Sequence, residues 1–191
     1  SRTALVGSTE QNRPVIEDSF VRLLTVMESH LTRHKFLLGD RPGRGDFGIF
    51  GQFSQLCFWE PDSALIAASQ SPRSIIWAYQ VDDLSSHDVG RDQGWFTRQN
   101  LPTTFHDLLC EIGQTYAPFM VANDRALASE EEEVICSIQG AEYRQAPFPY
   151  QRKCLMWLRE TFANLSPEDQ ESVKQLIDGT GCEVLVADER D

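Results

Sequence analysis

The distribution of hydrophobic positions along the first third of the chain is helical. Between about residues 9 and 33, apolar side chains recur at steps of three and four residues, namely Ile16, Phe20, Leu23, Leu24, Met27 and Leu31. This spacing predicts an amphipathic helix with one stripe that faces a core. Ser8 and Gln11 have the spacing of a capping box, and Pro14 stands near the helix start, where a missing N–H costs little.

A second helix is predicted over about residues 43–58, and its composition differs from that of the first. Its residues are apolar on nearly every side, which is typical of a helix inside a fold. Gly48 and Gly51 interrupt it, and each costs roughly 1 kcal/mol of helix propensity relative to alanine. We therefore expect a neighbouring helix to cross closely at these glycines.

Helical patterns also dominate the rest of the chain. Ser71 followed by Pro72 predicts a helix start, whereas residues 85–100 are polar and predict a loop. Residues 101–116 are again helical, and the pattern continues after a predicted break at Pro118. Two final helices are predicted, one over 149–165 and one that begins at a cap in 166–169 and ends at Gly179.

Only one segment has the signature of strands. Two short β-prone runs flank Gln139-Gly140, which predicts a hairpin over about residues 134–145. An isolated hairpin is marginally stable, so we expect it to pack on helices. The predicted fold is therefore all-α, a helical bundle with one small β-hairpin insertion. Residues 1–84 would form its core helices, and residues 85–191 would continue and extend the same domain.

Composition and charge narrow the classes of partner. The chain has 191 residues and a net charge of −12. Residues 1–100 carry 10 basic and 12 acidic side chains, whereas residues 101–191 carry 7 and 17, so the second half holds −10 of the total. An acidic surface repels phosphate backbones, so we expect no nucleic-acid partner. No apolar run is long enough for a membrane span, so no membrane partner is expected either.

The cysteines indicate a reducing compartment. Their number is odd, their spacing is wide and no C-x-x-C occurs among Cys57, Cys110, Cys136, Cys154 and Cys182. This pattern argues against a disulfide framework or a zinc site and favours the cytoplasm. Cys57 stands between aromatic residues with no basic neighbour that would lower its pKa, so we interpret it as a buried core residue and not as a nucleophile.

The segment 43–48 has three interpretations. Arg44-Gly45-Asp46 is an adhesion tripeptide, but it runs directly into apolar residues instead of an exposed loop tip. Residues 43–48 also fit G-x-G-x-x-G, but no preceding long strand or alternating strand–helix series supports a dinucleotide site. We favour a helix cap, in which the Asp46 carboxylate accepts the N–H of Gly43 and complements the helix dipole.

The capping segment resembles a known family. "FLLGDRPGRGDFGIFGQF" is similar to the segment F-L-x-G-D-x-P-S-x-A-D of cytosolic glutathione S-transferases, through Leu38, Gly39, Asp40, Pro42 and Asp46. In that family the segment opens the central buried helix of the all-α C-terminal domain. Pro72 and Trp77 likewise resemble a later P-x-x-x-x-W helix, so the resemblance covers about residues 10–84. Gly43 and Gly45 depart from it, since they replace the capping Ser/Thr and an alanine.

This resemblance has functional implications. Glutathione binds mainly to the family's N-terminal thioredoxin-like domain, which also supplies the catalytic residue and has no counterpart in residues 1–191. The first helix of the usual C-terminal domain has no counterpart either. The chain would then contribute an electrophile pocket and part of a homodimer interface, hold no cofactor itself, and be inactive alone. The alternative is a non-catalytic interaction or scaffold module with the same helical fold, because a fold does not determine a function.

Four aromatic residues are candidates for the substrate pocket. Trp59, Trp95 and Phe96 are suggested by the family's C-terminal domain, which lines that pocket, although packing within the core or a loop explains them equally well. Tyr150 belongs to a group of aromatic and cationic residues, with Tyr143, Arg144, Arg152 and Lys153, which could line a pocket for an acidic ligand or hold the hairpin.

His30 and His34 have a spacing at which two side chains on one helix can bind a metal ion. No glutamate lies between them, and we favour two solvated histidines near a helix end over a metal site. The predicted site residues are thus structural at Gly43 and Asp46, with no catalytic, cofactor-binding or metal-binding residue assigned.

Overall fold

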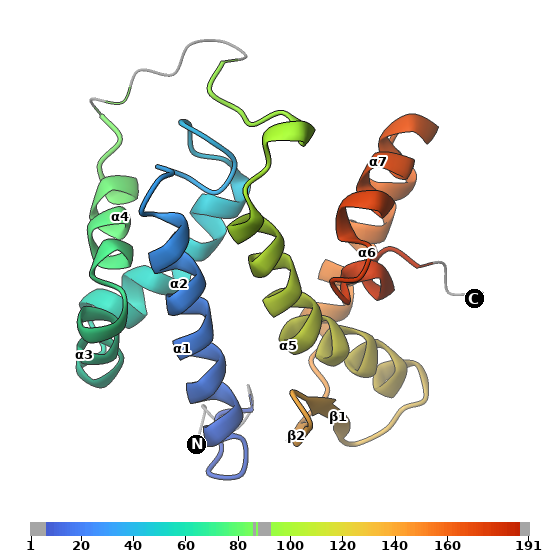
Figure 1. Ribbon diagram of the computed structural model, residues 1–191. Helices are drawn as coiled ribbons and strands as arrows, with labels where there is room; N and C mark the ends of the chain where they lie inside the picture. Colours follow the sequence, from blue (N-terminus) through green and yellow to red (C-terminus); the bar gives the residue numbers. More distant parts are fainter. Residues whose placement is uncertain (1–6, 86, 88–92, 188–191) are drawn as a thin grey trace. The chain divides into compact units, whose positions relative to one another are not determined.

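The computed structural model describes residues 7–85, 87 and 93–187, and they form mainly helices (Figure 1). The helices are α1 (Arg13–His30), α2 (Arg44–Phe58), α3 (Pro61–Gln70), α4 (Pro72–Asp82), α5 (Thr103–Ala128), α6 (Pro149–Ala163) and α7 (Pro167–Ile177). Strands β1 (Val134–Ile138) and β2 (Ala141–Gln145) form one hairpin, and Arg98–Asn100 and Cys182–Leu185 are short 3-10 helices. The predicted mostly helical fold with one hairpin is confirmed. In the described ranges no helix has the length and apolar character that a membrane span requires.

The chain divides into two compact units. Unit 1 comprises residues 1–19 and 109–191, and unit 2 comprises residues 20–108. We describe each unit by itself.

The core of unit 2 is built around Phe53 of α2. Its ring meets the ring of Phe20 edge-on, with centroids 6.4 Å apart, and that of Trp77 in the same way at 6.0 Å. Phe53 is 1% exposed and Trp77 is 2% exposed, and Leu24 and Met27 of α1 are fully buried. The apolar stripe predicted on the first helix therefore faces a core at Leu24 and Met27, whereas Ile16 of that stripe is 36% exposed. Helices α2 and α4 contribute one aromatic residue each to this core.

The prediction that the helix over about residues 43–58 lies inside the fold is wrong for one face of α2. Its buried residues are Asp46, Phe53 and Cys57, whereas Phe47 is 51% exposed. A Cβ atom built on Gly48 or Gly51 would meet no atom within 4 Å in the described part of the chain. The expected close helix crossing is thus not found there, and no described residue covers this face of α2.

Helix α3 was not predicted from the hydrophobic pattern. Pro61 occupies its first turn, and the Glu60 carboxylate caps it by accepting the N–H of Ser63 at 2.7 Å. Ala67 is its only buried residue, so the apolar periodicity is too weak to reveal the helix. The Glu60-Pro61 pair was the available signal, because proline is favoured in the first turn. The predicted helix start at Ser71 is confirmed, but the Ser71 hydroxyl donates to Glu28 instead of capping α4.

The predicted loop 85–100 falls partly outside the described residues, at positions 86 and 88–92. The described end of this loop lies beside the segment that precedes α2. The N–H of Asp40 donates to the carbonyl of Gly94 at 2.7 Å, and the N–H of Phe96 donates to the carbonyl of Leu38 at 2.8 Å. The two segments therefore hold each other by backbone hydrogen bonds.

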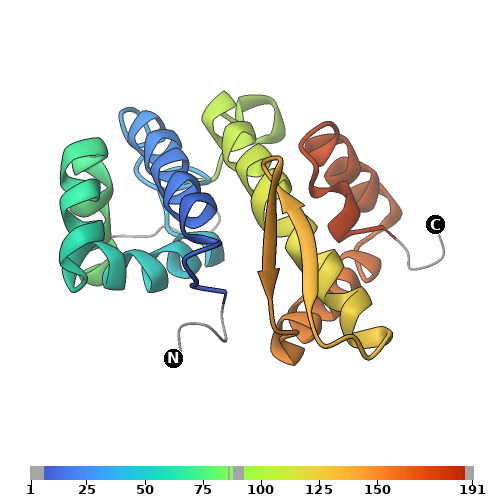
Figure 2. The same cartoon turned by 90° about the horizontal axis from the view of Figure 1, so that it is seen from below.

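Unit 1 has two buried clusters on α5. One joins Ala117 and Met120 to α6, α7 and the 3-10 helix, through Leu155, Ile177, Cys182 and Leu185. The other joins Phe119 and Ala126 to the hairpin, through Val134, Ile138 and Tyr143. The hairpin thus packs on α5, as expected for a two-stranded sheet that is unstable alone (Figure 2).

The predicted helix break at Pro118 is wrong, because α5 runs without interruption through it. Proline in a helix interior costs about 3 kcal/mol. Its neighbours Ala117, Phe119 and Met120 are all buried in the two clusters. Because most helix stability in proteins comes from packing, this burial outweighs the lost hydrogen bond.

The hairpin prediction is confirmed and its register is clear. Ile138 pairs with Ala141, and the turn residues Gln139 and Gly140 have φ values of 52° and 79°. Positive φ at both turn residues is the geometry that matches the twist of the flanking strands. The predicted cap at Ser166 is confirmed as well, since its hydroxyl accepts the N–H of Asp169 at 3.1 Å.

The capping box predicted at Ser8 and Gln11 is wrong. Helix α1 begins at Arg13, and Thr9 accepts the N–H of Asn12 at 3.3 Å in the turn that precedes it. Asn12 is fully buried, and its amide bonds to the backbone of Arg144 in β2. The segment before α1 therefore binds the hairpin through Asn12. Local spacing does not reveal this contact, because the two residues are far apart in the sequence.

Candidate functional site

The start of α2 is organised by Asp46, which is 1% exposed. One carboxylate oxygen accepts the N–H of Gly43 at 2.8 Å, and the other accepts the N–H of Leu37 at 2.9 Å. Burial raises the pKa of the Asp46 carboxyl, and these N–H donors oppose the increase. The predicted cap is confirmed, since the Asp46 carboxylate accepts the N–H of Gly43. The reciprocal bond of a capping box is missing, because Gly43 has no side chain that could accept the N–H of Asp46.

His30 also has a structural role. It is 2% exposed, so the prediction that it is solvated is wrong. Its Nε2 lies 3.0 Å from the Phe36 carbonyl, which can only accept, so Nε2 carries the proton. Its Nδ1 then accepts from the Thr104 hydroxyl at 2.8 Å. Burial lowers the pKa of His30, which keeps the ring neutral in this arrangement.

The His30–His34 pair shows no sign of a metal site. The two rings lie 4.9 Å apart, but both ring nitrogens of His30 are already engaged. Over the described ranges, no three His, Cys, Asp or Glu side chains gather in a way that could hold a metal ion. The His34 ring instead meets Phe96 edge-on at 5.0 Å.

Trp95 and Phe96, two of the four pocket candidates, lie together in the described end of the predicted loop 85–100. The Arg41 guanidinium lies 4.8 Å from the Trp95 ring centroid, within the range of a cation–π contact. A Cβ built on Gly43 would be 3.3 Å from the same ring, so the cap residue lies beneath it. Both aromatic residues therefore anchor their segment to the turn that precedes α2.

The other two candidates lie elsewhere. Trp59 is 76% exposed at the C-terminal end of α2. Trp95 lies at the opposite end of this 15-residue helix, so the two indoles are separated by roughly 20 Å. Tyr150 is 59% exposed on α6 in the other unit, where its ring meets Trp157 edge-on at 6.2 Å. The structure thus brings together Trp95 and Phe96 only.

Three thiols have properties of core residues. Burial raises the pKa of Cys57 to about 11, and it also raises the pKa values of Cys136 and Cys182. A thiol with a raised pKa has little of the nucleophilic thiolate at neutral pH. The interpretation of Cys57 as a core residue is confirmed by its 6% exposure.

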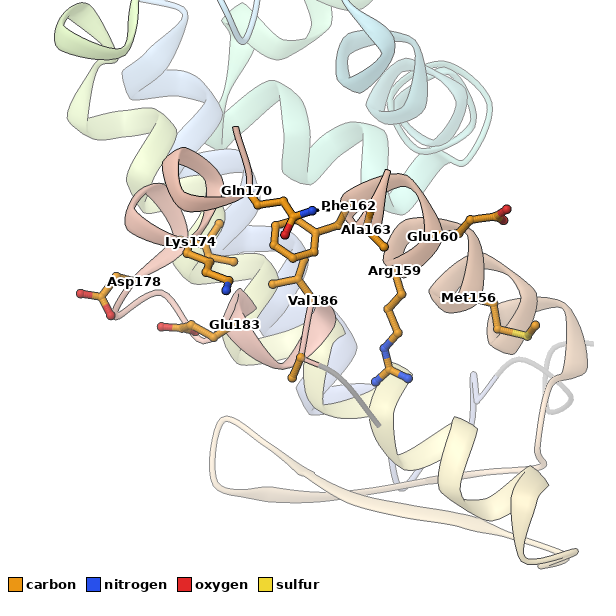
Figure 3. A pocket seen from close by; sticks show the side chains of 12 residues that line it. Met156, Arg159, Glu160, Phe162, Ala163, Gln170, Lys174, Asp178, Glu183 and Val186 are labelled. Carbon is orange, nitrogen blue, oxygen red and sulfur yellow. Dashed lines mark hydrogen bonds between the residues drawn. The ribbon is translucent and has the colours of Figure 1, made fainter. Parts of the chain in front are cut away.

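Unit 1 contains a groove of about 920 Å³, which we call the α6–α7 groove (Figure 3). Its lining comes from α6, from α7 and from the segment at and after the last 3-10 helix, namely Met156, Arg159, Glu160, Phe162, Ala163, Gln170, Lys174, Ile177, Asp178, Glu183, Val186 and Ala187. Its volume is within the range of small-molecule sites. No local pattern of residues indicates this groove, because it depends on how α6 and α7 pack against each other.

The α6–α7 groove has an apolar centre with cations beside it. Figure 3 shows Phe162, Gln170 and Val186 gathered there, with Lys174 on one side and Arg159 on another. The carboxylates of Asp178 and Glu183 point away from Phe162.

The polar side chains of the groove differ in how firmly they are held. The Gln170 amide donates to the carbonyls of Ala163 and Leu165, at 3.2 and 3.1 Å. A guanidinium nitrogen of Arg159 lies 3.6 Å from a carboxylate oxygen of Asp124, and the Arg159 side chain is 19% exposed. Lys174 is exposed, so it is the cation of the groove that a ligand can reach most readily.

A second, smaller groove of about 220 Å³ lies between α1, α5 and the hairpin in unit 1. Its lining is mostly apolar and includes Ile16, Phe119 and Tyr143. Tyr143 is held there, because its hydroxyl donates to the Gln145 side chain at 3.0 Å. The groove offers few polar groups to orient a ligand, so we regard the α6–α7 groove as the better candidate site.

Comparisons of the chain with known protein families, with curated proteins and with solved structures gave no match.

Proposed function

We propose that this chain is a helical ligand-binding domain of a glutathione transferase-like protein, and that it is inactive in conjugation by itself. Its site is the α6–α7 groove, and its ligand is an organic molecule with an apolar body and an acidic group. This corresponds to the electrophile-binding half of such an enzyme. Glutathione would bind to a thioredoxin-like domain beyond residues 1–191.

The observation that carries the proposal is the chemistry of the α6–α7 groove. Phe162 and Val186 offer an apolar surface to the body of a ligand, and the exposed Lys174 offers a positive charge to its acidic group. Ligand sites generally combine an apolar lining with a few polar groups that fix orientation. The lining also carries three carboxylates, but those of Glu160, Asp178 and Glu183 all point away from Phe162 at its centre, which leaves room for an anion beside Lys174.

The family part of the proposal rests on the start of α2. The carboxylate of Asp46 holds the turn before the helix, in the manner expected of the family's capping segment. The face of α2 with Phe47, Gly48 and Gly51 departs from the family, in which this helix is buried.

The absence of conjugation by this chain alone is supported by its reactive groups. The buried thiols have raised pKa values, and His30 uses both ring nitrogens for structural hydrogen bonds. These side chains are therefore unsuited to activate glutathione. Turnover of a chlorinated aromatic electrophile with glutathione by residues 1–191 would contradict the proposal.

A second candidate function is a non-catalytic interaction module that forms a homodimer, as the family resemblance implies. It is favoured by two exposed aromatic side chains that lie next to each other on α6, Tyr150 and Trp157, whose rings meet edge-on at 6.2 Å. Contiguous apolar side chains at a surface often mark a protein contact. A homodimer that is lost on Trp157→Glu substitution would favour this candidate.

The binding proposal is tested by titration with 8-anilinonaphthalene-1-sulfonate, a fluorescent apolar anion. Lys174→Glu should weaken binding about tenfold, which corresponds to roughly 1.4 kcal/mol. Lys153→Glu is the matched control, because Lys153 is an exposed lysine of α6 outside the groove lining. Equal affinity in both variants would contradict the proposal.

A further inference from the structure

The outer edge of β2 is occupied by the side chain of Asn12. The Asn12 amide N–H₂ donates to the Arg144 carbonyl at 2.6 Å, and its oxygen accepts the Arg144 N–H at 3.2 Å. The same amide also donates to the Gly7 carbonyl at 2.7 Å. Both backbone groups of Arg144 therefore point away from β1. The fully buried Asn12 takes the place of a neighbouring strand at that position.

This orientation fixes which backbone groups of β1 point outward. Arg144 pairs with Ile135, and Glu142 pairs with Ser137. In an antiparallel ladder, opposed residues alternate between pairs that exchange both hydrogen bonds and pairs that exchange none. Because Arg144 directs its groups outward, Ile135 and Ser137 must do the same on the other side of the hairpin. Each offers one N–H and one carbonyl there.

Among the residues that the structure describes, none occupies the outer edge of β1, in contrast to that of β2. Ile135 is 50% exposed and Ser137 is exposed as well. Within the part of the chain that the structure describes, no hydrogen bond reaches the outward groups of these two residues. Such an edge is a template on which an extended segment adds as a further strand.

We propose that the outer edge of β1 binds an extended, positively charged peptide segment of a partner protein as a third strand. The partner backbone would exchange hydrogen bonds with Ile135 and Ser137. This surface is independent of the α6–α7 groove and does not rest on the function proposed for it.

Charge decides between a cationic partner and a second copy of this chain. Residues 130–133 are four exposed glutamates that lead directly into β1. Glu133 is paired with Arg144 at 2.7 Å, and it precedes the strand on the same face as Ile135. A second copy carries the same net charge of −12 and is repelled. A strand with lysine or arginine beside these glutamates is attracted.

The alternation of side chains further defines the partner. Val134 and Ile138 of β1 are buried against α5, so Ile135 and Ser137 face away from it. An added strand presents its side chains in the same alternation. We therefore expect apolar residues on the side of α5 and basic residues on the opposite side, next to the glutamates.

The test uses a capped seven-residue peptide of alternating lysine and valine, measured by calorimetry at moderate salt. A second peptide of the same sequence carries N-methyl groups on amides of both of its own edges. Neither edge of this peptide can then donate its full set of hydrogen bonds to β1. Its charge and side chains are unchanged, so non-specific attraction to the acidic protein is the same. The wild-type protein should bind the first peptide at least about tenfold more tightly than the second.

Two proline variants localise the binding. Ser137→Pro removes an outward N–H from the β1 edge without removing a bond of the hairpin, as proline is tolerated at edges. Glu142→Pro is the matched control, because Glu142 lies directly opposite and its N–H points outward on the other edge. Ser137→Pro should abolish binding of the lysine–valine peptide, whereas Glu142→Pro should retain it, with melting curves to verify both folds.

Three results would overturn the proposal. They are absence of binding to the wild-type protein, equal binding of both peptides, and a concentration-dependent dimer of the wild-type chain that Ser137→Pro disrupts. The last result would assign the edge to a second copy. If Ser137→Pro does not fold, the comparison of the two peptides on the wild-type protein still decides.

Discussion

The carboxylate of Asp46 accepts the backbone N–H of Leu37, nine residues earlier in the chain, at 2.9 Å. Its other oxygen accepts the N–H of Gly43 at the start of α2. One buried side chain therefore fixes both the helix end and the turn that leads to it. That turn also holds the segment with Trp95 and Phe96 through the backbone of Leu38 and Asp40.

Asp46→Ala should lower the free energy of unfolding by about 2 kcal/mol or more, as measured by urea denaturation. The variant loses a helix cap and leaves the N–H of Leu37 buried without its acceptor. Glu60→Ala, which removes the exposed cap of α3, is the matched control and should have a smaller effect. An unaltered melting temperature of Asp46→Ala would refute the structural role.

The neutral state of His30 predicts a pH dependence of stability. Because burial lowers its pKa in the folded chain, the unfolded chain takes up a proton first as the pH falls below about 6.5. The contribution of His30 to stability is therefore complete above that pH and is lost as the pH falls toward the folded-state pKa. Between about pH 7.5 and 5.5, the wild-type protein should lose more stability than His30→Gln, which cannot titrate. Parallel profiles would contradict this assignment.

Two glycines in helices should respond to alanine in opposite directions. A Cβ on Gly113 of α5 would overlap with the carbonyl oxygen of Thr180, so Gly113→Ala should destabilise the protein by about 2 kcal/mol. A Cβ on Gly48 of α2 would meet open space, so Gly48→Ala should stabilise it by up to about 1 kcal/mol. Thermal unfolding measures both changes. Destabilisation by Gly48→Ala would show that the exposed face of α2 is covered in the protein.

Cys57 should be inert toward thiol reagents in the folded protein. Its pKa of about 11 and its 6% exposure both limit the reactive thiolate. Wild type and Cys57→Ala should therefore show the same number of fast-reacting thiols with Ellman's reagent near neutral pH. In urea the variant should show one thiol fewer. A difference between the two native proteins would mean that Cys57 is accessible.

Local sequence signals were sufficient for much of the fold. The cap at Asp46, the Gln139-Gly140 turn and the cap at Ser166 each depend on residues three or fewer positions apart, and all three are confirmed. The errors arose where distant contacts decide. Pro118 lies within a helix because its neighbours are buried. Asn12, which was expected inside the first helix, instead precedes α1 and forms a hydrogen bond with β2.

The candidate site was less accessible to sequence reasoning than the fold. Trp59 and Trp95 are both large and aromatic, but they lie at opposite ends of α2. The α6–α7 groove depends on residues from three separate elements, and neither Phe162 nor Lys174 is unusual in its local sequence. Its existence follows from packing between helices, which periodicity alone does not specify.

The most direct test of the ligand-binding claim is to map the site by backbone-amide chemical shifts during titration with 8-anilinonaphthalene-1-sulfonate. We predict that the perturbed amides fall in the groove lining, between Met156 and Ala187, and that Lys174→Glu removes the perturbation. Shifts confined to Trp95, Phe96 and the turn before α2 would contradict the account and would place the ligand at the residues first suggested by the family resemblance.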